Sequence, residues 1–352
     1  MPKLIMMLAL AFWALTLPVM AEENNGNSGE RRIMIAVALS FSEYQGRWER
    51  ELTVMRYHAA ANNFELRVEV ARDNQMQQNI QVDRLLSGQP DVLIISPHDA
   101  ASAASAIKKA KEQGVKVIFY DRLIMNADAD LYISFDSELV GRMQAQALLM
   151  AAPSGEYILL SGSPADHNTS LLFDGAMNIL GPYIDAGRIK VTAWQPIINW
   201  DPVWAEAAVE KVLAQGIRPA AILAPNDTTA GGAVEALVKR GLAGRVAVTG
   251  QDADQAAARR IAQGLQLMTA FKDTRLLAAK AMESAKKLAT GEPLEYSGHI
   301  NNGSHLVPAI LLEPVAVNRS NMVEILIDNG YLLYDHVFDR PTDQPPQPEN
   351  FN

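Results

Sequence analysis

Short apolar runs alternate with amphipathic stretches along most of the chain after about residue 32. Each run has the length and composition of a buried strand, and each stretch has apolar residues at helical spacing. The predicted strands are Ile33–Leu39, Leu66–Ala71, Val92–Ile95, Val115–Tyr120, Tyr157–Leu160, Ile189–Ala193, Ala220–Ala224 and Val246–Thr249. The predicted helices are Trp48–Asn62, Gln77–Leu86, Ala100–Gln113, Ser137–Ala151, Ser170–Leu180, Pro202–Gln215, Ala230–Lys239 and Ala253–Gln263. This alternation predicts an α/β protein with parallel sheets and helices on both faces.

The alternation is interrupted once, near Tyr132–Ser134, where a short extended run adds no ordinary βαβ unit. About four strand–helix units precede the interruption and about four follow it, which predicts two similar lobes. A helix over Thr274–Ala289 and the apolar runs Val307–Leu312 and Met322–Ile327 remain outside the series. The predicted N-terminal lobe is 32–134 with 271–301, and the predicted C-terminal lobe is 135–270 with 302–330. The crossings between them are predicted near Ser134–Phe135, Ala270–Phe271 and Asn301–Gly303.

Both ends of the chain differ from this pattern. Lys3, the apolar stretch Leu4–Leu17 and the small residues before Glu22 predict a signal peptide over 1–21, cleaved after Ala21. The apolar stretch is about 14 residues long, whereas a membrane-spanning helix needs about 20. Residues 22–31 are polar and predict a flexible leader. Residues 331–352 contain prolines and acids without periodicity, which predicts an extended or disordered tail.

Composition narrows the function classes. The chain has 352 residues, a net charge of −9 and a pI near 5.2, which argues against nucleic-acid binding. The absence of cysteine excludes disulfides, thiol catalysis and a lipid-anchored cysteine. The six histidines show no ligand spacing, and phosphate-loop, zinc-protease and serine-elbow motifs are absent. An enzyme is therefore the least favoured class, and neither a cofactor nor a metal is expected.

Polar groups follow three of the predicted strands. These groups are Phe119–Tyr120–Asp121–Arg122, Pro225–Asn226–Asp227 and Gly250–Gln251–Asp252–Ala253–Asp254. Ligands of open α/β sheets bind at the carboxyl ends of the strands. A carboxylate accepts from adjacent hydroxyls, and a guanidinium donates to two oxygens in a fixed fork. The pattern therefore predicts a site for a ligand rich in hydroxyl groups.

Two tryptophans are candidates for the apolar walls of this site. Trp48 and Trp200 fall at predicted loop or helix-start positions, and an indole can cover the C–H face of a pyranose. Arg47 and Arg50, beside Trp48, add possible donors. Structural packing of either tryptophan is the alternative, and the sequence leaves it open.

Further polar residues follow the fifth predicted strand and a predicted crossing. Asp166 and Asn168 are candidate ligand-binding residues, and Lys272 lies near the second crossing. Asp and Asn are also preferred helix caps, which is the alternative for these residues and for Asn226. The joint placement of all these groups at strand ends favours a binding site over isolated structural roles.

These residues carry a resemblance. The chain resembles the periplasmic sugar-binding proteins of the ribose/galactose type, and within them the D-xylose-binding group of bacterial ABC importers, from about Arg32 to Ile327. The matching stretches are Val117–Arg122, Asn126–Asp128, Tyr132–Asp136, Gly162–Pro164, Asn226–Ala233, Gly250–Asp254, Asn301–Gly303 and Val307–Pro308. The resemblance implies two Rossmann-like lobes, three hinge crossings and one sugar held between the lobes. The site residues that it implies are Arg47, Trp48, Arg50, Asp121, Arg122, Asp166, Asn168, Trp200, Asn226, Asp252 and Lys272.

The expected function is therefore that of a periplasmic receptor of a sugar ABC importer, which binds D-xylose or a similar aldopentose. Its expected partners are a monosaccharide and a membrane permease with its ATPase, and the protein is expected to be a monomer. The alternative is a receptor for another aldose or a furanose-like signal that feeds a chemotaxis or two-component sensor. Arg50 in place of a lysine and His167 in place of an amide leave the exact sugar open. A transcription repressor would need a helix-turn-helix where the signal peptide is predicted.

Overall fold

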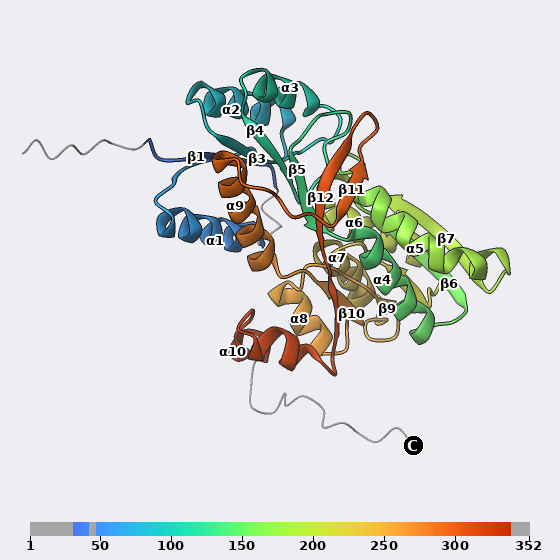
Figure 1. The fold of residues 1–352 in the computed structure, drawn as a ribbon. Coiled ribbons are helices and arrows are strands. Elements are labelled where there is room, and N and C mark those ends of the chain that lie inside the picture. Colours follow the sequence, from blue (N-terminus) through green and yellow to red (C-terminus); the bar gives the residue numbers. More distant parts are fainter. Residues whose placement is uncertain (1–30, 42–46, 339–352) are drawn as a thin grey trace, which may run out of the picture. The chain divides into compact units, whose positions relative to one another are not determined.

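The computed structural model describes residues 31–41 and 47–338 (Figure 1). The predicted signal peptide, nearly all of the predicted leader, and the last part of the predicted tail lie outside the described residues. Every element described below belongs to the unit that begins at Arg32. No helix of the described ranges is both long and apolar enough to cross a membrane.

The first lobe is built on a seven-stranded sheet with the order β11-β12-β5-β4-β3-β1-β2. Its strands are β1 (Met34–Leu39), β2 (Glu65–Val70), β3 (Val92–Ser96), β4 (Lys116–Tyr120), β5 (Leu131–Phe135), β11 (Gly298–Asn301) and β12 (Leu306–Leu312). All neighbours pair in parallel except β11 and β12, which are antiparallel. β1, β3 and β5 are buried along their whole length, as their continuous apolar sequences predict.

Two layers of helices enclose this sheet. The helices are α1 (Arg47–Ala61), α2 (Gln75–Ser87), α3 (Ala104–Glu112) and α9 (Thr274–Thr290). α2 and α3 pack on one face, and α1 and α9 pack on the other (Figure 1). α3 begins four residues later than predicted, because the Asp99 side chain accepts hydrogen bonds from the backbone N–H groups of Ala101 and Ser102 and holds a turn there.

The second lobe contains a parallel four-stranded sheet with the order β7-β6-β8-β9. Its strands are β6 (Gly155–Ser161), β7 (Ile189–Pro196), β8 (Ala221–Leu223) and β9 (Ala247–Val248), and β10 (Met268–Phe271) pairs separately with β13 (Val315–Asn318). A bridge between Gln251 and Ala270 connects the segment after β9 to β10. β10 and β13 therefore continue this sheet.

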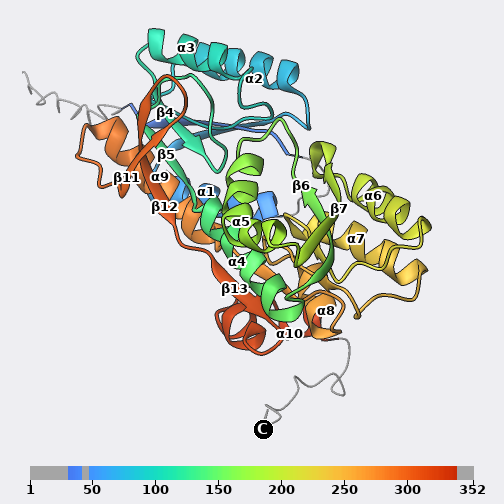
Figure 2. The same ribbon diagram turned by 90° about the vertical axis from the view of Figure 1, so that its right-hand side faces the viewer.

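Helices again cover both faces of the second sheet. They are α4 (Ser137–Ala151), α5 (Asn168–Asp185), α6 (Pro202–Ala214), α7 (Asp227–Lys239) and α8 (Gln255–Ala262), with a short 3-10 helix at Ile198–Trp200. α4 and α5 pack on one face, and α6 and α7 pack on the other (Figure 2). The predicted α/β architecture of two lobes with largely parallel sheets is confirmed.

The chain passes between the two sheets three times. It passes between β5 and α4, between β10 and α9, and between β12 and β13. The prediction of the third crossing at Asn301–Gly303 is wrong, because this segment is the turn between β11 and β12. Residues 306–312, expected in the C-terminal lobe, instead form β12, which pairs with β5. β12 is a continuous apolar run (Leu-Val-Pro-Ala-Ile-Leu-Leu) that would suit the sheet of either lobe, so the sequence alone could not assign it.

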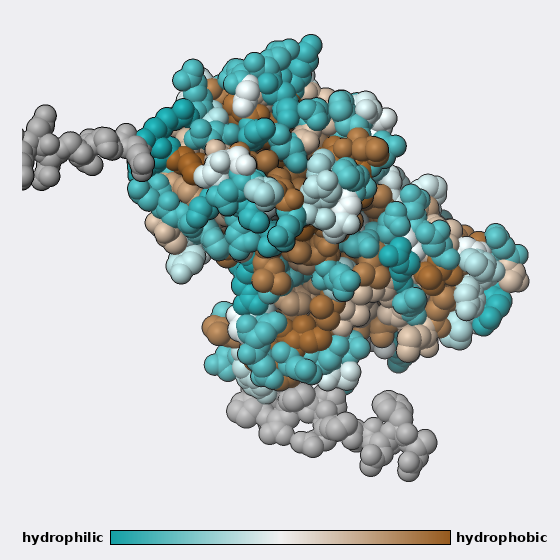
Figure 3. Space-filling model, viewed as in Figure 1, coloured by the Kyte–Doolittle hydropathy of each residue, from teal (hydrophilic) through white to brown (hydrophobic). Residues whose placement is uncertain are grey.

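The C-terminal segment corrects a second prediction. Residues 331–338 are not a tail, because Tyr331, Leu332, Val337 and Phe338 are buried against α8, β10 and β13. This segment contains α10 (Tyr334–Val337) and follows a π-helical turn at Val323–Asp328. Apolar residues gather around α8 and α10 on the face shown in Figure 3. This segment therefore packs against the second lobe although its sequence has no helical or strand periodicity. Its backbone turns tightly, so its buried side chains need not follow a regular repeat.

Candidate functional site

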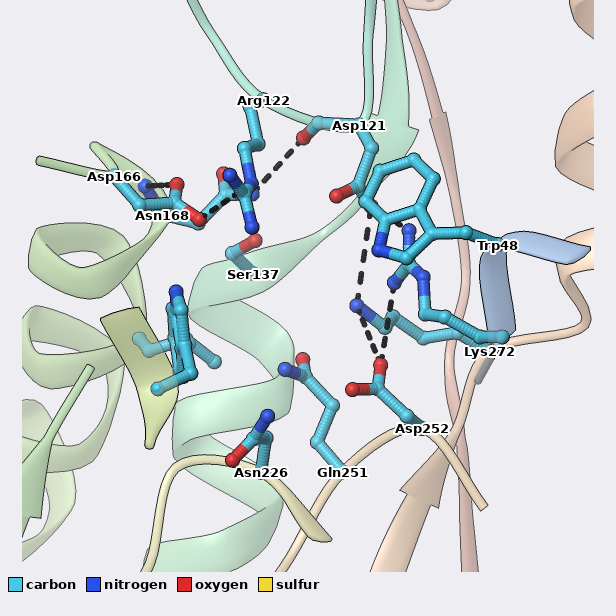
Figure 4. Close-up of a pocket in the computed structure, with 13 residues that line it drawn as sticks. Trp48, Asp121, Arg122, Ser137, Asp166, Asn168, Asn226, Gln251, Asp252 and Lys272 are labelled. Atoms are coloured by element: carbon cyan, nitrogen blue, oxygen red, sulfur yellow. Dashed lines mark hydrogen bonds and ion pairs between the residues drawn. The ribbon is translucent and has the colours of Figure 1, made fainter. Parts of the chain in front are cut away.

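A pocket lies between the two sheets, at the carboxyl ends of their strands. Its lining comes from both lobes (Figure 4). The lining residues are Arg47, Trp48, Asp121, Arg122, Ser137, Asp166, Asn168, Leu172, Trp200, Asn226, Gln251, Asp252 and Lys272. Ten of the eleven residues predicted from the sequence are among them.

Arg50 is the predicted site residue that does not line the pocket. Its guanidinium carbon lies 3.9 Å from the centroid of the Tyr331 ring, outside the pocket lining. Helical spacing would allow both arginines to share a face, but the Arg50 guanidinium packs on Tyr331 while Arg47 lines the pocket. The structure therefore does not bring Arg50 together with the other predicted site residues.

Gln251, Ser137 and Leu172 line the pocket but were not predicted. Gln251 stood in the strand-end segment that the sequence singled out, and its place directly before Asp252 was the available signal. Ser137 opens α4 directly after the first crossing, and Leu172 lies one turn into α5. No sequence signal distinguishes these two from an ordinary helix-start serine and a core leucine.

Arg47 occupies the centre of the charged part of the site. Its Nη2 lies 2.8 Å from Asp121 of the first lobe, and its Nη1 lies 3.3 Å from Asp252 of the second lobe. Its Nε lies 2.9 Å from Glu51, one turn further along α1. One guanidinium therefore connects a helix, the end of β4 and the opposite lobe.

Asp121 follows β4 directly and is buried among cations. Burial opposes its ionisation, but Arg47, Lys272 and Arg122 together hold the pKa of Asp121 below its ordinary value. Lys272 Nζ lies 3.0 Å from Asp252 and 4.0 Å from Asp121. Asp121 is therefore ionised at neutral pH and can accept hydrogen bonds from hydroxyl groups.

Arg122 and Asp166 join the lobes on the other side of the pocket. Arg122 Nε lies 2.9 Å from Asp166 Oδ2, and its Nη1 donates to the carbonyl of Pro97. Burial raises the pKa of Asp166, although Arg122 opposes the shift. Figure 4 shows Arg122 pointing toward Asp166 and Asn168 across the pocket. Both residues were predicted as separate ligand contacts, and the structure places them in contact with each other.

Asn168 adds an uncharged contact between the lobes. Its Nδ2 donates to the carbonyl of Asp121 at 2.9 Å, and its backbone N–H donates to Asp166 Oδ1 at 3.0 Å. Beyond the pocket, the backbone N–H of Ala100 donates to the carbonyl of Ala165 at 2.9 Å. The two lobes therefore meet directly around the pocket.

Trp48 has both of the roles that the sequence left open. It is buried in the core of the first lobe, and it also lines the pocket. Its ring stacks on Phe41 at 5.4 Å between centroids, and the Arg47 guanidinium lies 4.5 Å from the ring centroid. These contacts hold the indole in one orientation beside the pocket.

Trp200 lines the pocket from the second lobe on a backbone with positive φ. Asn199 and Trp200 have φ values of 53° and 58°, which L-residues adopt at a cost. The indole lies over Gly162 at the end of β6, where an added Cβ would fall 2.1 Å from Trp200 Cη2. Only glycine at position 162 therefore permits this placement of the ring.

Apart from arginine nitrogens that face carboxylates, two buried polar atoms of the pocket have no hydrogen-bond partner among the described residues. They are Trp200 Nε1 and Gln251 Oε1, a donor and an acceptor. Buried polar groups are nearly always satisfied in folded proteins. Their arrangement in one pocket is typical of a site whose ligand supplies the missing partners.

Asn226 and Asp227 divide two tasks at the start of α7. The Asn226 side chain accepts from the backbone N–H of Thr229 and completes a capping box, as the structural alternative predicted, while the residue also lines the pocket. Asp227 is buried below the pocket and accepts from Gln266 and Thr269. Burial, together with the neighbouring carboxylate of Asp254, raises its pKa well above the ordinary value.

Comparison with known proteins shows which family this chain belongs to. The family described as periplasmic binding protein domain matches residues 36–293. The chain belongs to this family. It is similar to the D-xylose-binding periplasmic protein of Escherichia coli, with 41% identity over 81% of this chain and 87% of that protein. It is also 34% identical to the multiple sugar-binding periplasmic receptor ChvE of Rhizobium radiobacter, over 73% of this chain and 79% of that receptor.

Solved structures of periplasmic binding proteins confirm the fold. A carbohydrate transporter solute-binding protein of Chloroflexus aurantiacus, in complex with D-glucose, has a TM-score of 0.82. It is 32% identical to this chain, and the match covers 88% of this chain and 99% of that one. The relatives are periplasmic binding proteins and not enzymes. Within the described residues, no group of His, Cys, Asp or Glu side chains is arranged to hold a metal.

Proposed function

We propose that this protein is the substrate-binding receptor of a sugar ABC importer and that it holds D-xylose or a similar aldopentose between its lobes. The observation that carries the proposal is the pocket itself, where carboxylates, amides and two indoles from both lobes surround one space. Such a set suits a ring that has hydroxyls on its edge and C–H groups on its faces. The D-xylose-binding relatives support the choice of ligand.

The side chains divide the work according to their chemistry. Asp121, Asp166 and Asp252 accept from hydroxyls, and Arg47, Arg122 and Lys272 donate. Asn168, Asn226 and Gln251 offer both functions, and Trp48 and Trp200 cover the ring faces. No covalent step is required, because every role is one of recognition.

The two lobes are proposed to move as units about the three crossings. The proposed first lobe is 32–135 with 273–312, and the proposed second lobe is 137–271 with 315–338. A sugar that contacts both lobes only when they are closed shifts the hinge equilibrium by its difference in affinity for the two states. The closed form would dock on a membrane permease whose ATPase powers import.

Export and assembly complete the proposal. The relatives are periplasmic, and the predicted signal peptide with cleavage after Ala21 would deliver this chain to the same compartment. The receptor is proposed to act as a monomer. A sensory role for another aldose or a furanose-like signal remains the alternative, because one relative is named a multiple sugar-binding receptor.

Thermal unfolding with a panel of aldoses tests the proposed function. A ligand that binds only the native state raises the melting temperature. A rise with D-xylose that exceeds the rise with hexoses and ribose supports the aldopentose assignment. A larger rise with another sugar would replace xylose as the ligand, and no rise with any sugar would contradict the receptor function.

A further inference from the structure

Glu51 is a buried carboxylate directly behind the pocket, and the ligand roles proposed above do not use it. Its residue is fully buried on α1, one helical turn after Arg47. Its Oε1 lies 2.9 Å from Arg47 Nε, and its Oε2 accepts a hydrogen bond from the Tyr120 hydroxyl at 2.5 Å. A carboxylate without solvent is costly to bury, so these two contacts must compensate for lost hydration.

The first contact fixes the arginine at the centre of the site. The three nitrogens of Arg47 face three different carboxylates, those of Glu51, Asp121 and Asp252. Asp121 and Asp252 line the pocket and would be shared with a ligand, whereas Glu51 does not line it. Glu51 is therefore the partner that holds Arg47 in place whether or not a sugar occupies the pocket.

The second contact, from the Tyr120 hydroxyl, holds the Glu51 carboxylate against β4. Tyr120 is fully buried at the end of β4 and directly precedes Asp121. The Glu51 carboxylate thus joins α1 to β4 at the point where each presents a pocket residue. These two pocket residues, Arg47 and Asp121, contact each other directly, with 2.8 Å between Nη2 and Oδ1.

We propose that Glu51 is a positioning residue that sets the geometry of Arg47 and Asp121 for the sugar and makes sugar affinity depend on pH near neutrality. This inference rests on the proposed sugar-binding function. Glu51 acts through its neighbours and does not touch the ligand. Ionised Glu51 holds the guanidinium by charge, and protonation leaves only the weaker hold of a neutral group.

The surroundings of Glu51 support a change of charge in this range. Burial raises its pKa to about 7, Asp121 acts in the same direction, and Arg47, Tyr120 and Lys272 oppose the shift. Tyr331 of the C-terminal segment also interacts electrostatically with the Glu51 carboxylate. Asp254 on the second lobe titrates nearby, because burial and Asp252 raise its pKa to about 6. A test must therefore separate these two carboxyl groups.

Calorimetric titration of D-xylose into wild type, Glu51→Gln, Glu51→Asp and Asp254→Asn between about pH 5.5 and 8.5 tests the proposal. Glu49→Gln is the matched control, because Glu49 is an exposed carboxylate on the same helix. Wild-type affinity is expected to fall as pH drops through about 7, and Asp254→Asn and Glu49→Gln should keep this profile. Glu51→Gln should bind about tenfold or more weakly at high pH, with a flatter profile, and Glu51→Asp should recover part of both properties.

The unfolding free energy of the same variants separates positioning from support of the fold. A merely structural role predicts that Glu51→Gln lowers stability and affinity together, whereas a positioning role predicts weaker binding by a protein at least as stable at high pH. Wild-type affinity and an unchanged pH profile in Glu51→Gln would overturn the role of Glu51 alone. Failure of the wild type to bind any aldose would overturn the proposed function and, with it, this inference.

Discussion

The guanidinium of Arg50 lies 3.9 Å from the centroid of the Tyr331 ring, which connects α1 of the first lobe to the C-terminal segment that packs on the second. Arg275 of α9 lies 5.2 Å from the same ring, and its Nη1 donates to the carbonyl of Asn329. Two arginines of the first lobe therefore hold one aromatic ring of the second. Arg50 therefore packs on the C-terminal segment and not on the pocket.

Tyr331→Ala should destabilise the protein by about 3 kcal/mol, because it removes a large buried ring and both cation–π contacts. Chemical unfolding of the two proteins measures this difference. Leu333→Ala is a suitable control in the same segment, since Leu333 is exposed. Equal stability of Tyr331→Ala and the control would mean that the segment does not belong to the core.

Arg50→Ala should retain sugar binding, because Arg50 does not line the pocket. Its affinity for the sugar is expected to change less than about tenfold, because the lost contact with Tyr331 lies outside the pocket. Arg122→Ala, which removes a pocket donor and the partner of Asp166, should lose much more affinity. Similar losses of affinity in these two variants, measured by calorimetry, would mean that Arg50 contributes to sugar binding after all.

Asp121→Asn should weaken sugar binding by at least about tenfold, because a charged acceptor becomes a neutral one. Asparagine keeps the shape of the side chain, so binding can be measured on a folded protein. Asp99→Asn is a control, since this partly buried carboxylate caps a turn outside the pocket. Undiminished binding by Asp121→Asn would contradict the placement of the sugar.

Gly162→Ala should abolish or severely weaken binding, because the new Cβ would collide with the Trp200 indole and displace it. Gly181→Ala on α5 is the matched control, since nothing lies within 4 Å of a Cβ at that position. The control should be neutral or slightly stabilising, as expected for a helical glycine. Intact affinity in Gly162→Ala would show that the ligand does not depend on this position of Trp200.

Glu51 should make the unliganded protein less stable as pH rises toward neutrality. Its pKa in the folded protein is about 7, against an ordinary value of 4.5, so folding favours the protonated form. This contribution is fully present below about pH 4.5 and is lost as pH rises through about 7. Unfolding of Glu51→Gln across the same range should show a smaller decline, since Asp254 and Asp166 also have raised pKa values and still contribute. An identical decline in both proteins would assign it to these other groups.

Much of this architecture follows from the sequence because its signals are local. Strands such as Met34–Leu39 are continuous apolar runs, and helix starts such as Asp201–Pro202 carry their own cap. Pocket residues at strand ends could be predicted because parallel strands bring their carboxyl ends to one edge. Asp121 and Asp252 were found in this way.

The failures arise where pairing over long sequence distances decides the outcome. β12 could have joined either sheet, and its register with β5 depends on contacts more than 170 residues apart in sequence. Arg50 leaves the site because of Tyr331, a partner near the other end of the chain. Glu51 has the spacing of an ordinary i,i+4 surface pair, and only its complete burial distinguishes it.

Calorimetric titration of D-xylose into the wild-type protein and Asp121→Asn, side by side at neutral pH, is the most direct test of sugar binding between the lobes. The account predicts saturable binding of one sugar per chain in the wild type and a loss of at least about tenfold in the variant. Absence of binding in the wild type, or equal binding by both proteins, would contradict it.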